Sequence, residues 1–118
     1  MTQEGVRESG LTAIGDDPIL AEIVARIVPA LHPQRIYLFG SQARGDAGSD
    51  SDYDILVVVK ERSGPGYATE RVAYRALRGL GAPVDVLVVT VDRFERRSSV
   101  IASLPATVLR EGKLLYAA

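Results

Sequence analysis

The feature that most constrains this fold is a short connection between two apolar runs. Residues 35–39 (RIYLF) form the first run and residues 55–59 (ILVVV) the second, with a Gly-Ser pair and two aspartates between them. The connection from Phe39 to Asp52 is too short for the helical crossover that parallel neighbours need. It therefore predicts an antiparallel pair, in which the first strand ends beside the start of the second.

Three aspartates are expected at one edge of the sheet. Side chains alternate between faces along a strand, so Asp52 and Asp54 share one face, next to Gly40 and Ser41. A third apolar run, residues 83–89 (PVDVLVV), follows a long segment with a helical pattern, which predicts a parallel crossover. If the second and third strands are neighbours, Asp85 reaches the same edge.

The remaining segments predict helices that flank a small mixed sheet, an α/β fold of the α+β type. The first helix starts at an Asp16 or Asp17 cap followed by Pro18, and we expect Pro29 to kink or fray its last turn. Apolar residues recur along it at helical spacing and predict one buried stripe: Leu20, Ile23, Val24, Ile27 and Leu31.

The second half of the chain predicts three more helices and a final strand. A helix is expected over residues 67–80, and a short one around Phe94 with Asp92 as its cap. A further helix over 99–111 would bend near Pro105 and end at Gly112, and residues 113–117 would form an edge strand.

Length and composition limit the classes of protein that fit. The 118 residues suit a single domain over 16–118 after a loose polar lead-in over 1–15. A net charge of −1 argues against long nucleic acid as the main substrate, and the absence of cysteine excludes thiol chemistry and disulfides. No long apolar run or leader-like start is present, so we expect a cytoplasmic protein away from membranes.

Three close carboxylates repel one another, and a divalent cation would offset that repulsion. Oxygen ligands favour Mg²⁺ or Mn²⁺, and Mg²⁺ commonly shares its coordination shell with substrate phosphates. Gly40 would let the backbone approach a phosphate closely, and Ser41 would offer a hydroxyl group. The pattern therefore predicts a metal-dependent phosphate chemistry.

Simpler structural roles and a calcium-binding loop explain the same residues less well. The aspartates could be strand-end caps or solvated acids, but Asp85 stands between valines. Asp50, Asp52, Asp54 and Glu61 match the spacing of a calcium-binding EF-hand loop, yet Ile55 stands where that loop needs glycine, so we reject it.

Four other residues are interpreted as structural. Arg71, Arg75 and Arg78 follow one side of a helix and are interpreted as a solvated face. Tyr53 points away from the two aspartates that flank it, which favours a role in core packing.

The motif resembles a known family. Gly40-Ser41, ten residues, then Asp52-Tyr53-Asp54 is similar to the signature of the DNA polymerase beta-like nucleotidyltransferase superfamily. The longer string LFGSQARGDAGSDSDYDILVVV resembles its minimal nucleotidyltransferase (MNT) domains, which include the antitoxins of HEPN–MNT pairs.

The resemblance implies a role for each site residue. Asp52 and Asp54 would bind two Mg²⁺ or Mn²⁺ ions, and Asp85 would complete the catalytic metal site and help to deprotonate the attacking hydroxyl. Gly40 and Ser41 would hold the β- and γ-phosphates of the nucleotide.

In the same way, Arg44 would neutralise phosphate charge. The implied reaction moves a nucleoside monophosphate, AMP from ATP, onto a hydroxyl. For the antitoxin type, that hydroxyl belongs to a tyrosine of the partner HEPN toxin, and its modification silences the toxin.

Two alternatives remain open at this stage. The domain could neutralise its partner by contact alone, with the carboxylates as remnants. It could also modify a small molecule whose pocket is supplied by a separate subunit. Where the domain acts as an enzyme, we expect the acceptor or its binding site to come from outside this domain.

Overall fold

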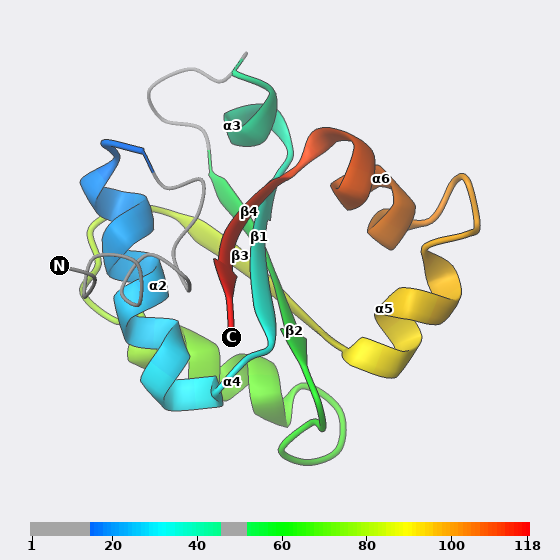
Figure 1. Cartoon of the computed structure of the whole chain (residues 1–118). Coiled ribbons are helices and arrows are strands. Elements are labelled where there is room, and N and C mark those ends of the chain that lie inside the picture. The colour runs from blue at the N-terminus through cyan, green and yellow to red at the C-terminus, as the bar shows by residue number, and fades with distance from the viewer. Residues whose placement is uncertain (1–14, 46–51) are drawn as a thin grey trace, which may run out of the picture.

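A computed structural model of the chain describes residues 15–45 and 52–118, and within them a four-stranded sheet lies between two layers of helices (Figure 1). The strand order across the sheet is β3-β2-β1-β4. The strands are β1 (Arg35–Phe39), β2 (Tyr53–Val59), β3 (Val84–Thr90) and β4 (Lys113–Ala117).

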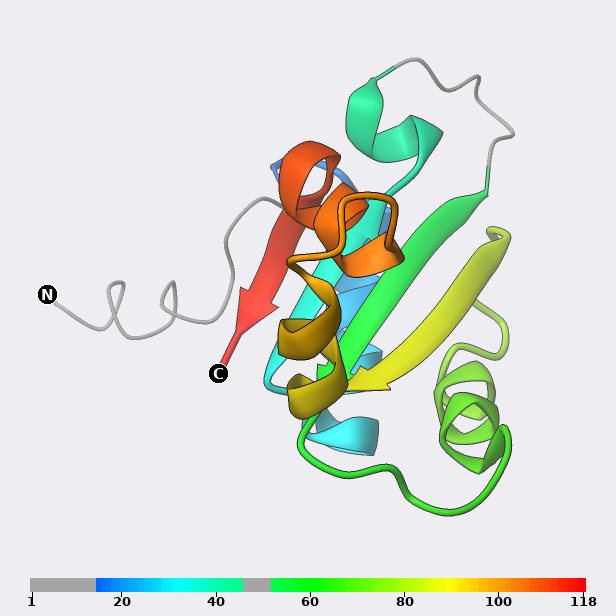
Figure 2. The same cartoon turned by 90° about the vertical axis from the view of Figure 1, so that its right-hand side faces the viewer.

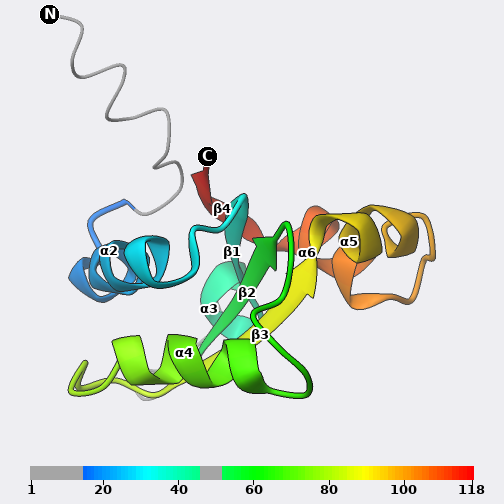
Figure 3. The same ribbon diagram turned by 90° about the horizontal axis from the view of Figure 1, so that it is seen from below.

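The helices form two layers with the sheet between them. Helices α2 (Pro18–Leu31) and α4 (Ala68–Ala76) cover one face, and α5 (Val91–Arg97) and α6 (Leu104–Glu111) cover part of the other (Figures 1 and 3). The short helix α3 (Ser41–Arg44) follows the end of β1. The predicted mixed sheet flanked by helices is therefore confirmed.

The pairing of the strands confirms the inference from connection lengths. Strand β1 runs antiparallel to β2, with Phe39 opposite Asp54. Strand β2 runs parallel to β3, with Asp54 opposite Asp85. Strand β4 pairs antiparallel with β1 at the edge of the sheet, as expected for residues 113–117.

The protein has one hydrophobic core on each face of the sheet, because successive side chains of β2 point to opposite faces and pack against different helices. Residues 55–59 are all buried, which is why this run is continuously apolar. Ile55 and Val57 pack in the larger core with α2 and α4, whereas Leu56 and Val58 pack with Phe94 of α5 in the smaller one. Asp54 shares its face with Leu56, so it faces the side that α5 and α6 cover only in part.

The first helix matches its predicted start and continues beyond its proline. The Asp17 side chain accepts hydrogen bonds from the backbone N–H groups of Ile19 (2.9 Å) and Leu20 (3.4 Å), so Asp17 rather than Asp16 is the cap. The helix passes through Pro29 and ends at Leu31. Four of the five predicted stripe residues are buried and Leu31 is half-buried.

Three predicted boundaries were wrong, one because the helix gives way to tighter turns and two because another residue forms the cap. Helix α4 ends at Ala76, where tighter turns begin, rather than at residue 80. Thr90, not Asp92, caps α5, and it accepts a hydrogen bond from the N–H group of Arg93. Helix α6 starts at Leu104 instead of residue 99, because Ser103 is its cap.

Pro105 accordingly lies in the first turn of α6, where proline fits without bending the helix. Gly112 ends this helix as expected. The lead-in expected over 1–15 lies, apart from Gly15, outside the described residues. Within 15–45 and 52–118, no helix combines the length and apolar character that crossing a membrane would need.

Candidate active site

The three predicted aspartates lie at one edge of the sheet, at the starts of β2 and β3. Asp54 and Asp85 are register partners on adjacent parallel strands, so their side chains share one face. Asp52 precedes β2 by one residue and is exposed, as Asp85 is, whereas Asp54 is half-buried. Figure 2 shows the face of the sheet that α5 and α6 cover in part, and there the starts of β2 (green) and β3 (yellow) lie away from these two helices.

The electrostatics of Asp54 show that the carboxylates influence one another. Burial raises the pKa of Asp54 above its ordinary value, and the negative charges of Asp85 and then Asp52 raise it further. The positive charge of Arg44 acts in the opposite direction. The edge is therefore a place where a cation or a proton lowers the free energy.

Glycine is the only residue type that fits at position 40, where the end of β1 meets the Asp54 side chain. Its backbone has φ +78° and ψ −159°, a combination that is strained for residues with a Cβ. A Cβ at this position would overlap Asp54 Oδ2 and lie 3.2 Å from Asp54 Cγ. The glycine therefore brings the β1–α3 backbone into direct contact with the central carboxylate.

The Gly-Ser pair also starts a helical turn. Helix α3 begins at Ser41, and the backbone N–H groups of Ala43 and Arg44 both donate to the Gly40 carbonyl at 3.1 Å. Arg44 lies at the end of this turn, exposed, with its guanidinium 3.9 Å from Glu111 of α6. Gly40, Ser41 and Arg44 thus lie on the β1 side of the aspartates.

Tyr53 anchors the start of β2 from the opposite face, and this contact was missed in the sequence. It packs against the larger core, as predicted, and its hydroxyl also donates a hydrogen bond of 2.9 Å to Asp17 Oδ2. Burial and the neighbouring Asp17 carboxylate raise the pKa of Tyr53. No pattern joins residues 36 positions apart, so only the fold shows this link.

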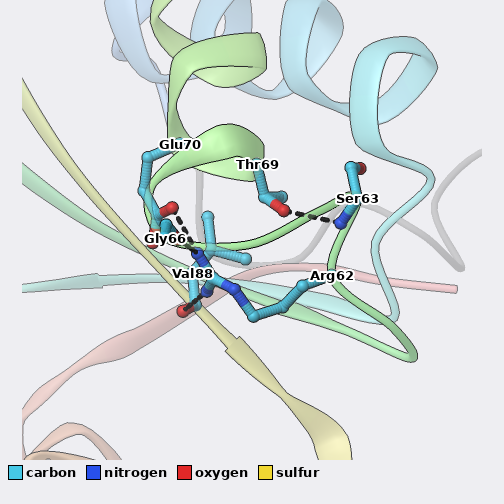
Figure 4. Close-up of polar contacts among 6 residues, drawn as sticks. All are labelled: Arg62, Ser63, Gly66, Thr69, Glu70 and Val88. Atoms are coloured by element: carbon cyan, nitrogen blue, oxygen red, sulfur yellow. Dashed lines mark hydrogen bonds and ion pairs between the residues drawn. The ribbon is translucent and has the colours of Figure 1, made fainter.

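A second group of missed residues holds the outer edge of β3. The N–H group of Val86, next to Asp85, donates to the Tyr74 hydroxyl at 2.8 Å. The Val88 carbonyl accepts a 2.7 Å hydrogen bond from Arg62, which also pairs with Glu70 (Figure 4). Two backbone groups at this edge, the Val86 N–H and the Val88 carbonyl, are therefore occupied by side chains, which helps to hold the strand that carries Asp85.

The donor set at this edge fits a hard divalent cation, since it consists of carboxylate oxygens. Within residues 15–45 and 52–118, no three histidine, aspartate or glutamate side chains are gathered as a formed metal-binding group. The mutual repulsion at Asp54 is the observation that favours a cation here.

Comparison with known proteins identifies the family of this chain. Residues 18–114 match the family model described as a nucleotidyltransferase domain. The chain belongs to the nucleotidyltransferase domain family. The match spans every helix and strand described above except the end of β4. A search of curated proteins finds no match.

Solved structures with this nucleotidyltransferase fold include toxin–antitoxin complexes. A toxin–antitoxin structure with AMP-PNP is 24% identical, with a TM-score of 0.56 over 87% of this chain and 74% of that one. A mutant MntA–HpeT toxin–antitoxin is 26% identical, with a TM-score of 0.53 over 84% and 70% of the two chains. A nucleotidyltransferase structure from Sulfolobus solfataricus is 28% identical, with a TM-score of 0.52 over 71% and 85%.

Proposed function

We propose that this domain transfers a nucleoside monophosphate, AMP from ATP, to a hydroxyl of a partner protein, and that it thereby acts as the antitoxin of a toxin–antitoxin pair. The observation that carries the proposal is the register of Asp54 with Asp85 beside Gly40. Membership of the nucleotidyltransferase family supports the reaction class. The likeness to toxin–antitoxin structures, one of them with AMP-PNP, supports the biological setting.

The nucleotide would lie across the strand edge with its phosphates toward β1. Gly40 and Ser41 would hold the β- and γ-phosphates, because the glycine backbone leaves room and the serine adds a hydroxyl donor. Arg44, which already acts on the charge of Asp54, would offset phosphate charge. These contacts would place the α-phosphate above Asp52 and Asp54.

Asp52, Asp54 and Asp85 would hold two Mg²⁺ or Mn²⁺ ions, which would stabilise negative charge on the reacting phosphate. The acceptor oxygen would form a bond to the α-phosphorus while the bond to the β-phosphate oxygen breaks. Pyrophosphate leaves with the electron pair, and Asp85 would accept the hydroxyl proton. Most of the protein's contribution is then positioning and charge stabilisation.

The acceptor in this proposal is a tyrosine of a HEPN-type partner toxin, and its modification would silence that toxin. The test is to co-express the partner, add Mg²⁺ and α-labelled ATP, and follow label on each protein. We expect label on the partner with the wild-type domain and none with Asp52→Ala combined with Asp54→Ala. Labelling that survives the double substitution would rule out this mechanism.

The same variant separates catalysis from neutralisation by contact. If the double variant still protects cells from the partner, the domain neutralises the toxin by binding alone. If the partner is never labelled but a small hydroxyl compound is, the acceptor class is wrong and the transferase chemistry stands.

A further inference from the structure

The proposed reaction fixes the side from which the acceptor must approach. In phosphoryl-type transfer the attacking and leaving oxygens lie roughly in line. With Gly40 and Ser41 on the β1 side of β2, pyrophosphate would leave in that direction. The acceptor would therefore arrive from the opposite side, where β3 is the neighbour of β2.

The sheet surface on that side is apolar and partly open. Leu56 and Leu87 are register partners, two residues beyond Asp54 and Asp85 on the same face. Leu87 remains 44% exposed although it lies in a strand. Next to it, a pocket of about 220 Å³ has Leu56 and Val89 in its lining.

Two arginines of α5 line the same pocket. Arg93 and Arg97 are four residues apart and so lie on one side of α5, where both face this pocket. Among the described residues neither forms an ion pair, whereas Arg96 pairs with Asp92 at 3.1 Å. We call Leu56, Leu87, Val89, Arg93 and Arg97 the β3 trough.

We infer that the β3 trough binds the acceptor as an extended protein segment and selects an acidic residue three to five positions from the modified hydroxyl. The inference rests on the proposed function. Asp85 and Val89 are four strand residues apart, about 13 Å at roughly 3.3 Å per residue. An extended segment with its hydroxyl at Asp85 spans the same distance in about four residues and ends at Arg93 and Arg97.

Two observations favour a protein segment that lies on the face of the sheet. At the outer edge of β3, the Val86 N–H group and the Val88 carbonyl are already bonded to Tyr74 and Arg62, which disfavours pairing with another strand at these two groups. A polynucleotide would need a longer basic track than this surface offers on a protein whose net charge is −1, because the neighbouring Arg62 and Arg96 are paired with carboxylates. The β3 trough is apolar along the strand and positively charged beside α5. It therefore suits a peptide that carries aromatic or aliphatic side chains followed by an acidic one.

The experiment uses synthetic peptides as acceptors with Mg²⁺ and α-labelled ATP. Each peptide carries one tyrosine and one glutamate placed two to seven residues away on either side, and a matched set carries lysine in place of glutamate. For the wild-type protein we expect kcat/KM about tenfold higher for glutamate than for lysine at three to five positions, and no difference at seven.

The decisive variant combines Arg93→Glu and Arg97→Glu, with Arg71→Glu and Arg75→Glu as the matched control. The control pair has the same spacing on α4, in the helix layer of the opposite face, and both residues are exposed. We expect the α5 variant to reverse the preference in favour of lysine and the control to keep the wild-type preference. Reversal cannot come from a general loss of structure, and thermal unfolding of each variant verifies folding.

Three outcomes would overturn the inference. One is an unchanged preference in the α5 variant. Another is weaker binding of ATP itself in that variant, which would assign Arg93 and Arg97 to the nucleotide. A third is transfer by the wild-type protein to an oligonucleotide or a partner protein but to none of the peptides. Wild-type protein that releases no pyrophosphate with any acceptor would instead contradict the proposed function.

Discussion

Replacing Gly40 with alanine is the sharpest test of the contact between the β1–α3 turn and Asp54. The substitution introduces two separate costs. The backbone at φ +78° and ψ −159° is unfavourable for alanine, at about 1–3 kcal/mol. The new Cβ would also overlap Asp54 Oδ2, so Asp54 must move or β1 and β2 must separate. We expect Gly40→Ala to lower the free energy of unfolding by about 2–4 kcal/mol.

The same displacement should act on catalysis more strongly than on stability. A reactive group misplaced by about 1 Å reduces the rate by roughly 100-fold. We therefore expect transfer from α-labelled ATP to fall by at least about 100-fold at a temperature where the variant remains folded. Urea unfolding followed by circular dichroism gives the stability, and label transferred to the acceptor gives the rate.

Gly45→Ala is the matched control, because Gly45 ends the same short helix at φ +81°. A Cβ at Gly45 meets no heavy atom within 4 Å among the described residues. This variant should lose about 1–2 kcal/mol from backbone strain alone and keep its transfer activity. Equal losses of stability and activity in the two variants would refute the role assigned to the contact with Asp54.

Three further predictions concern the residues around the site. Asp54→Asn should abolish transfer yet stabilise the metal-free protein at neutral pH, because the raised pKa of Asp54 means that its ionised carboxylate opposes folding. Thermal unfolding across pH should show this gain appear as pH rises above the ordinary pKa of an aspartate, and vanish in acid, where the Asp54 carboxyl is neutral in both the folded and the unfolded protein. Tyr53→Phe should lower the free energy of unfolding by about 1–2 kcal/mol, because it removes the hydrogen bond to Asp17. The pKa of Tyr53 is raised in the folded protein, so the stabilisation by its hydroxyl is complete below pH 10 and is lost as pH rises through the folded pKa; urea unfolding of wild type and variant should therefore converge at alkaline pH. Tyr74→Phe should lower kcat with little change in the KM for ATP, because it removes the hydrogen bond from the Val86 N–H group that positions the neighbouring Asp85. A change in KM alone would contradict this positioning role of Tyr74.

The sequence predicted the strand pairing because connection length limits topology strongly. A short link between Phe39 and Asp52 left only an antiparallel pair, and a long helical link before residue 83 indicated a parallel one. These two pairings bring Asp54 and Asp85 into register and place Gly40 beside them. The arrangement of the candidate site could thus be predicted before any coordinates were known.

The helix ends were harder to predict because they depend on single hydrogen bonds. Ser103 followed by Pro105 is a start signal for a helix, but the apolar residues before it extended the predicted helix to residue 99. In α5, Thr90 and Asp92 are both suitable caps, and only the backbone geometry selects Thr90. Such choices lie within a single turn and leave the sheet unchanged.

The contacts that hold the site could not be found from sequence patterns. Tyr53 with Asp17, and Arg62 with Val88, join positions that are distant in the chain and obey no periodicity. The β3 trough likewise exists only once α5 packs against the same face as the aspartates. These features depend on tertiary packing, which local propensity does not encode.

The proposed reaction transfers the nucleoside monophosphate of ATP and releases pyrophosphate. The most direct measurement compares ATP labelled at the α-phosphate with ATP labelled at the γ-phosphate, in parallel reactions with Mg²⁺ and the co-expressed partner. We expect the α-label to become covalently attached to the partner, while the γ-label of the consumed ATP appears in pyrophosphate. Attachment of the γ-label, or release of the γ-label as inorganic phosphate without any attached α-label, would contradict it.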